Sequence, residues 1–244
     1  MIRSRLGLKA LCMCALVLGL MAVWAGAAQA ESTGGSWTYI TGSGQLKTFE
    51  GALAEPEVGS LLDTTVVLHS KALGGTKVLY ECGAVTTFQT RLKPNGVVLG
   101  KLIFSLCETF LEGVLSKNCV PTLGGVNKGF IETNLIKAQM LLHSGSRILI
   151  AEGETANGGA ANLATIESTA SCALGIKVPV GGKVAILPSN PTTHEEEHLI
   201  TVFPALTAAW ILSNTAEHKA EILGSAWAYL IFGHNEFEWA GLWN

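Results

Sequence analysis

Aspartate is almost absent from this chain, since Asp63 is the only one among 244 residues. Calcium loops of the EF-hand and RTX types, paired-aspartate acid proteases and kinase metal sites all need several aspartates at close spacing. The sequence therefore excludes these sites. A Ser-His-Asp triad would have to use Asp63 or a glutamate, and no G-x-S-x-G segment is there to present a serine.

Basic residues are few and do not cluster along the sequence. Without the first 30 residues, 13 Lys and Arg stand against 19 Asp and Glu, which leaves a net charge of −6. Binding to nucleic acid requires clustered Lys and Arg that neutralise phosphates. We therefore expect no nucleic-acid partner.

The N-terminal segment has the pattern of a secretory signal peptide. Three basic residues fall within the first nine positions, an apolar stretch covers residues 10–24, and Ala28-Gln29-Ala30 forms a small-residue exit. This order predicts cleavage before Glu31, and the apolar stretch is too short for a retained anchor. We expect residues 1–30 to be removed and the product to be secreted, in the extracellular space, the periplasm or the cell envelope, without a transmembrane anchor.

Residues 31–36 read as a flexible leader, and residues 37–244 as a β-rich domain. In that domain short apolar runs with β-branched or aromatic residues alternate with turn residues every eight to twelve positions. The rhythm predicts an all-β fold, a sandwich or an irregular barrel. The expected strands are residues 37–40, 46–49, 64–70, 77–82, 85–91, 97–105 and 109–115, a hairpin of 134–143 with 147–152, and buried strands within 199–212 and 222–233, with a loop or short helix at 214–221.

Two similar strings suggest two related β units. VLGKLIF at residues 98–104 parallels VGGKVAI at residues 180–186, and a cysteine precedes each string. A boundary between the units would fall in the glycine-rich residues 153–162. The alternative is a single undivided domain.

Four cysteines remain after the predicted cleavage: Cys82, Cys107, Cys119 and Cys172. An even number in an exported protein predicts two disulfides, with three possible connectivities. Ser189 stands where the second unit would carry the counterpart of Cys107. We therefore favour Cys107–Cys119 and Cys82–Cys172.

The string His194-Glu195-Glu196-Glu197-His198 matches the zincin pattern H-E-x-x-H. Its two histidines can bind one zinc ion only if they lie on a helix, since on a strand they would be about 13 Å apart. The following residues 199–203 are β-prone, so we favour a solvated acidic turn. The alternative is a zinc-dependent metallohydrolase with His194 and His198 as ligands and Glu195 as the catalytic residue.

Four tryptophans fall in the last 35 residues: Trp210, Trp227, Trp239 and Trp243. Exposed rings of this kind serve as stacking platforms for sugars, so a carbohydrate-binding module is a further alternative. Packing in the core is the interpretation that we favour.

With these four cysteines, the VLGKLIF string and KVPVGGK at residues 177–183, the chain resembles a loose group of uncharacterised secreted bacterial proteins that are β-rich and contain cysteines. The resemblance covers most of the mature chain. It implies an exported β-rich protein, and it implies no activity, cofactor or site residues. In that group a further cysteine often follows the second string, where Ser189 stands here.

Together these observations favour an exported protein without catalytic activity and without a cofactor. We expect a structural or binding role in the envelope or outside the cell, with a cell-envelope component or a glycan as the ligand.

Overall fold

The computed structural model of the chain describes residues 32–49, 57–72, 75–213, 216–232 and 235–243. In this part of the chain every regular element is a β-strand, apart from one turn of 3₁₀ helix, which confirms the predicted all-β class. Residues from Ser32 onward group into one compact unit. The described residues contain no helix that is long and apolar enough to cross a membrane. The signal peptide predicted at residues 1–30 lies outside the described residues.

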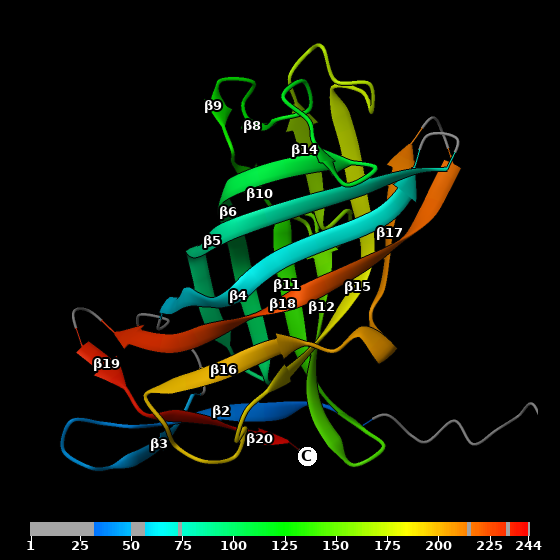
Figure 1. Ribbon diagram of the computed structural model, residues 1–244. Helices are drawn as coiled ribbons and strands as arrows, with labels where there is room; N and C mark the ends of the chain where they lie inside the picture. The colour runs from blue at the N-terminus through cyan, green and yellow to red at the C-terminus, as the bar shows by residue number, and fades with distance from the viewer. Residues whose placement is uncertain (1–31, 50–56, 73–74, 214–215, 233–234, 244) are drawn as a thin grey trace, which may run out of the picture. The chain divides into compact units, whose positions relative to one another are not determined.

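The elements follow one another along the chain as Figure 1 labels them. Their bounds are β1 (Ser32–Thr33), β2 (Gly35–Ile40), β3 (Leu46–Thr48), β4 (Glu57–Ala72), β5 (Thr76–Lys93), β6 (Val97–Leu111), β7 (Val114–Leu115), β8 (Pro121–Leu123), β9 (Asn127–Lys128), β10 (Ile131–Glu132), β11 (Leu135–His143), β12 (Ser146–Glu154), β13 (Ala160–Ala161), β14 (Ala164–Ser168), β15 (Lys177–Pro188), β16 (Glu197–Val202), η1 (Pro204–Leu206), β17 (Ala208–Ser213), β18 (Ala216–Phe232), β19 (Asn235–Phe237) and β20 (Trp239–Trp243).

The long strands close into a ring through antiparallel pairings. The order is β4, β5, β6, β11, β12 and β15, followed by β16 with β17, then β18, which pairs with β4 again (Figure 1). Both β16 and β17 pair with β15 on one side and β18 on the other, and η1 separates them. The ring is therefore irregular, because two short strands share one place in it.

The predicted hairpin is confirmed. β11 and β12 pair along their whole length, from Leu135 opposite Glu154 to His143 opposite Ser146. Residues 77–82 and 85–91, predicted as two strands, are both parts of β5. Residues 97–105 and the first three residues of the predicted segment 109–115 are parts of β6, and the last two residues of that segment form β7. One bulge shifts the register of β5 with β6 without ending either strand, and Gln89, with a φ of 51°, lies at this shift.

Two expectations near the ends of the domain are wrong. Ser32 and Thr33 pair with β11 as strand β1, and the leader therefore belongs to the sheet. The next strand, β2, begins with Gly35, and glycine suits this position because a Cβ there would collide with the carbonyl oxygen of Leu242. Residues 214–221 were predicted as a loop or short helix, but from Ala216 on they belong to strand β18. An antiparallel strand tolerates polar residues on its solvated face.

A separate sheet of three strands orders β20, β2 and β3. Two backbone hydrogen bonds between Glu195 and Trp239 connect β20 with the segment that precedes β16. The C-terminal strand is thereby held against the ring.

Two disulfides are present, as expected, but the favoured connectivity is wrong. Cys82 bonds to Cys107, and Cys119 bonds to Cys172. Cys82 and Cys107 are direct cross-strand partners in the register of β5 with β6, so no other cysteine can compete for either.

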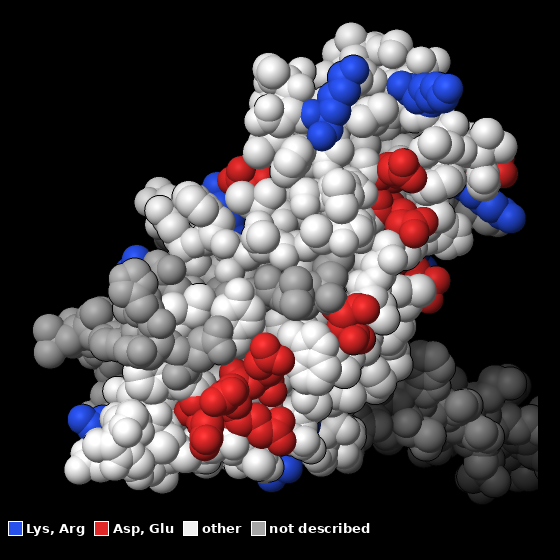
Figure 2. Space-filling model, turned by 60° about the vertical axis from the view of Figure 1, so that its left-hand side comes forward, with Lys and Arg blue, Asp and Glu red and all other residues white. Residues whose placement is uncertain are grey.

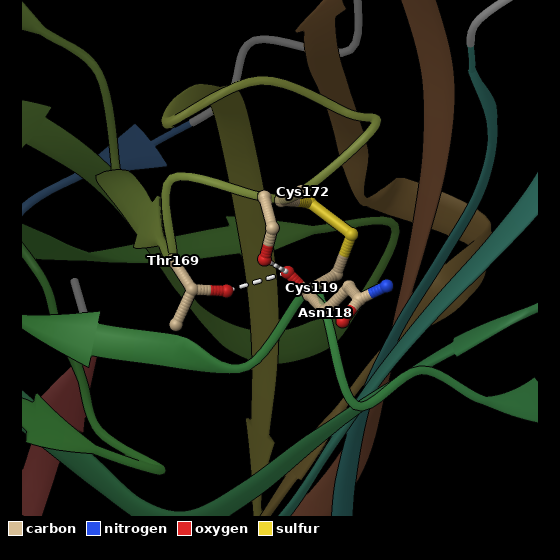
Figure 3. Close-up of a disulfide and its surroundings, with 5 residues drawn as sticks. Asn118, Cys119, Thr169 and Cys172 are labelled. Carbon is tan, nitrogen blue, oxygen red and sulfur yellow. Dashed lines mark hydrogen bonds between the residues drawn. A yellow bond between two sulfur atoms is a disulfide. The ribbon is translucent and has the colours of Figure 1, made fainter.

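The second disulfide connects two loops. It joins the segment before β8 to the connection between β14 and β15 (Figure 3). The hydroxyls of Thr169 and Ser171 donate hydrogen bonds to the carbonyl oxygen of Asn118 beside it. These contacts bind the two loops to one another.

The buried side chains form two clusters. We call the first the cystine cluster because it contains all four half-cystines; its members are Val78, Tyr80, Cys82, Cys107, Cys119, Ile131, Ala164, Ile166, Cys172, Leu174, Val178, Val180, Ala209, Ile211 and Ala220. We call the second the tryptophan cluster; its members are Trp37, Leu92, Ala138, Met140, Leu149, Ala151, Ala228, Leu230 and Trp239.

Candidate functional site

A cavity of about 200 Å³ lies inside the ring, and members of both clusters line it. Its walls come from β4, β5, β6, β10, β11, β12, β14, β15, β16 and β18 and from residues next to them. Among the described residues, those that line it carry no charge, and only Tyr80, Thr133 and Ser225 carry a hydroxyl group. The cavity is therefore an apolar space with three polar side chains in its wall.

The two similar strings of the sequence contribute equivalent wall residues. Leu102 and Phe104 on β6 correspond to Val184 and Ile186 on β15, and all four line the cavity. Successive side chains of a strand point to opposite faces, so residues two apart face the same side. These corresponding residues of the two strings thus occupy equivalent positions in the cavity wall.

The lysine of each string points away from the cavity and forms an ion pair. Lys101 Nζ lies 2.6 Å from Glu132 Oε1, and Lys183 Nζ lies 3.0 Å from Glu152 Oε2. β6 and β15 flank the β11–β12 hairpin, one on each side. The two strings therefore occupy matched places around the hairpin.

Several side chains that line the cavity remain half-buried, among them Val66, Phe104, Ile186 and Ile222. Apolar residues in a close-packed core are normally fully buried. The partial exposure of these residues shows that the packing leaves space against their surfaces.

Two of the three hydroxyl groups have partners within the protein. Ser225 donates to Asp63 Oδ2 over 2.8 Å and lies 2.9 Å from Thr64 Oγ1, at the bulge between β18 and β4. The hydroxyl oxygen of Thr133 accepts the backbone N–H of Leu102 over 2.9 Å. The only aspartate of the chain therefore has a structural contact at the cavity wall.

The third hydroxyl belongs to Tyr80, which is 1% exposed. Val78, Tyr80 and Cys82 are the buried positions of this part of β5, so the Tyr80 side chain points into the ring. Among the described residues its hydroxyl has no hydrogen-bond partner. Burial raises the pKa of this phenol well above its ordinary value of 10.0, because the charged form is desolvated.

The string predicted as an acidic turn or a zinc site is a turn followed by the start of β16. Glu196 and Glu197 are exposed, which agrees with the solvated turn. Figure 2 shows acidic side chains gathered on one face of the molecule. The helix that a zinc site would require is not formed, and in the described part of the chain no three His, Cys, Asp or Glu side chains are placed to hold a metal ion. The zincin geometry of His194, His198 and Glu195 is therefore not realised.

His198 differs from the expectation, because it is 1% exposed rather than solvated. Its Nδ1 lies 3.0 Å from the carbonyl oxygen of Ser189, and its Nε2 lies 2.7 Å from that of Trp239. Carbonyl oxygens only accept, so the ring donates to one of them when neutral and to both when protonated. His198 thus fastens β20 to the ring of strands.

The other two residues of the string contact different neighbours. His194 Nε2 lies 3.0 Å from Thr38 Oγ1 on β2, while Glu195 accepts a hydrogen bond of 3.0 Å from Asn190. The first contact holds the turn against the three-stranded sheet, and the second lies within the turn itself.

The C-terminal tryptophans are used mainly for packing. Trp239 is buried, and its ring centroid lies 5.5 Å from that of Trp37, which also contacts Trp243 at 6.3 Å. The half-buried Trp210 lies so close over Gly181 that a Cβ there would collide with its ring. Trp227 is likewise half-buried.

Comparison of the chain with protein-family models, with curated proteins and with solved structures finds no match. The site is therefore interpreted from its own geometry.

The sequence interpretation missed the cavity and Tyr80. The available signal was the pair of similar strings, in which Leu102 and Phe104 and the corresponding Val184 and Ile186 line the cavity and the lysines do not. No local pattern marks Tyr80, because the lack of a partner depends on strands far away in the sequence.

Proposed function

We propose that this protein is an exported, non-catalytic binding protein that holds a small apolar molecule inside its ring of strands. The single observation that carries the proposal is the apolar cavity of about 200 Å³ between the two buried clusters.

The energetic cost of such a space supports a ligand. Each Å² of apolar surface left in contact with water costs about 25 cal/mol, so the uncovered apolar wall of this partly open space is unfavourable. Domains are stable by only about 5 to 15 kcal/mol in total. A bound molecule that restores the missing contacts would recover much of this cost.

The size of the cavity limits the ligand. An engineered apolar cavity of about 150 Å³ holds benzene, which has six carbon atoms. Scaled by volume, 200 Å³ accommodates about eight carbon atoms. A compact aromatic or branched molecule of that size suits the space better than a long lipid chain.

The wall favours binding over catalysis. The described side chains that line the cavity provide no carboxylate, imidazole or free thiol that could act as an acid, a base or a nucleophile. The signal-peptide pattern and the two disulfides support a protein that works outside the cytoplasm. A role in carrying or sequestering a small apolar molecule there is the simplest activity that fits.

Titration calorimetry with ethylbenzene tests the proposal. We expect saturable binding to the full-length mature protein and its loss in Ala226→Leu, because Ala226 lines the cavity and is 8% exposed. Ala160→Leu, at an exposed position of β13, is the matched control and should bind as the wild type does. No saturable binding to the wild type, or equal binding to Ala226→Leu, would overturn the proposal.

A further inference from the structure

Apolar side chains are exposed at one end of the molecule, where Figure 1 places β8 and β9. We call this the loop end and define it as residues 113–130 and 169–177, two segments that the Cys119–Cys172 disulfide joins (Figure 3). Among the described residues the loop end carries five of the eleven large apolar side chains that are exposed, which are Val114, Leu115, Val126, Phe130 and Ile176. Clusters of exposed apolar side chains mark contacts with partners or with membranes.

The loop end is basic, although the chain as a whole is acidic. It contains Lys117, Lys128 and Lys177 and no Asp or Glu. In Figure 2 basic side chains are uppermost among the charged groups of that face, at the end that is also uppermost in Figure 1. Lys177 pairs with Glu167 over 3.0 Å, whereas Lys117 and Lys128 are exposed and have no carboxylate partner among the described residues. Two lysines are therefore available to an anionic surface.

The apolar side chains and the free lysines lie on the same loops. Val126 is 79% exposed in the turn of the β8–β9 hairpin, and Lys128 follows two residues later. Lys117 precedes the half-cystine Cys119 by two residues, and the hydroxyls of two residues of the other loop bind the intervening carbonyl of Asn118. The disulfide and these hydrogen bonds hold the loops before any partner arrives, so little conformational freedom is lost on binding.

An anionic lipid surface matches this arrangement better than a protein does. Binding at a membrane surface draws on buried apolar area and on the attraction of lysines to anionic lipids. The exposed apolar side chains come from separate loops rather than from one continuous face. A fluid bilayer adapts to each tip, whereas a protein partner would need a complementary hollow for each of them.

We propose that the loop end binds the surface of an anionic lipid bilayer, with Val126 in the interface and Lys117 and Lys128 against the lipid phosphates. None of these three residues lines the cavity. The membrane contact is therefore independent of the proposed binding of a small apolar molecule, and either can fail without the other.

Sedimentation of the protein with lipid vesicles tests the inference. One set of vesicles contains phosphatidylglycerol and phosphatidylcholine in equal parts, and the other contains phosphatidylcholine alone. We expect the wild type to sediment with the anionic vesicles, and much less with the neutral ones. Raising the salt concentration from about 0.1 M to about 1 M should weaken the binding, because it shortens the screening length from about 10 Å to about 3 Å.

Substitutions at the loop end separate its two contributions. Val126→Ser should weaken binding to the anionic vesicles about tenfold, because the apolar side chain is lost from the interface. Lys117→Gln together with Lys128→Gln should weaken it about thirtyfold, which is about fivefold for each lysine. The matched control combines Leu46→Ser with Lys47→Gln on β3, where Leu46 is 63% exposed, and should bind as the wild type does.

All of these positions are exposed, so the variants should fold and should bind ethylbenzene as the wild type does. Absence of the wild type from the anionic pellet, or equal weakening in the control on β3, would overturn the inference and leave the cavity proposal standing. If the vesicles do not bind the protein but Val126→Ser dissociates a dimer of it in solution, the loop end is an interface between two copies and the membrane contact is wrong.

Discussion

Replacement of Tyr80 by phenylalanine should stabilise the ligand-free protein. The substitution removes a hydroxyl that is buried and, among the described residues, without a partner, while it keeps the ring that packs in the cystine cluster. Burial of an unpaired hydroxyl costs about 1 to 3 kcal/mol, so the free energy of unfolding should rise by that amount. In a chain of this length each kcal/mol raises the melting temperature by about 2 to 4 °C.

The assay is calorimetric or urea unfolding of the protein after an apolar resin has removed bound small molecules. Tyr39→Phe serves as the control for loss of a tyrosine hydroxyl outside the cavity wall. A fall in stability of Tyr80→Phe by more than about 1 kcal/mol would refute the reasoning, because it would mean that the hydroxyl has a stabilising partner.

Alkaline pH gives the same prediction a second readout. The pKa of Tyr80 is raised in the folded state, so above the ordinary value of 10.0 the unfolded chain releases a proton that the folded protein keeps. The wild type therefore retains its full stability below pH 10 and loses up to about 1.4 kcal/mol per pH unit above it through this residue. Tyr80→Phe lacks this loss, and the stability difference between the two proteins should widen above pH 10. A constant difference would contradict the raised pKa.

Four further variants test the packing, the second disulfide and the buried histidine. Ala226→Leu fills the cavity and should leave the unfolding free energy unchanged or raised, whereas Ala138→Leu, 7% exposed in the tryptophan cluster, should lower it by about 1 to 3 kcal/mol in urea titrations. Serine at both Cys119 and Cys172 opens a loop of 53 residues and should lower the unfolding free energy by up to about 4 kcal/mol. Peptide mapping of the wild type should recover the Cys119–Cys172 pair rather than a Cys107–Cys119 pair. His198→Ala should lower the unfolding free energy by about 2 to 4 kcal/mol, because it removes a buried, hydrogen-bonded side chain. Its zinc uptake in equilibrium dialysis should equal that of the wild type. A lower zinc uptake would show that His198 binds zinc.

Local patterns in the sequence were sufficient for some of the strands, whereas β8, β14 and the ring strand β15 were not among the predicted segments. The β11–β12 hairpin could be predicted because a Ser-Gly-Ser turn separates two arms with period-two apolar residues, and both signals lie within 20 residues. Strand ends were less predictable. Polar residues at the start of β18 resemble a loop in sequence, and only the pairing with β4 and β17 keeps them extended.

A register count from the β5–β6 turn gives the disulfide pairing only when the bulge at Gln89 is known. Lys93 pairs with Val97 across the β5–β6 turn, and a regular register from there would place Cys82 opposite Glu108. The extra residue at the Gln89 bulge shifts the register by one, which places Cys82 opposite Cys107. The similarity between the two strings had favoured the pairs Cys107–Cys119 and Cys82–Cys172. The register is the stronger evidence, because side chains directly opposite in an antiparallel pair are in contact.

The buried state of His198 could not be predicted from the string around it. Its ring contacts the backbone carbonyl of Trp239, which follows 41 residues later in the chain. The acidic neighbours of His198 indicated solvent, but alternation along β16 gives Glu197 the outer face while the ring of His198 takes the inner one. Contacts between distant segments, rather than the composition of the string, decide the role of this histidine.

The cavity persists because of residue sizes at a few inward positions. Ala151, Ala164 and Ala226 line it from three different strands, and a larger apolar residue at any of them would occupy part of the space. Gly224 leaves less room for a larger residue, since a Cβ there would come within 2.9 Å of Val66. The ring of strands sets the outline, and the three alanines set the volume that remains. The range of ligands should therefore narrow stepwise as leucine replaces each alanine, with the largest probe lost first.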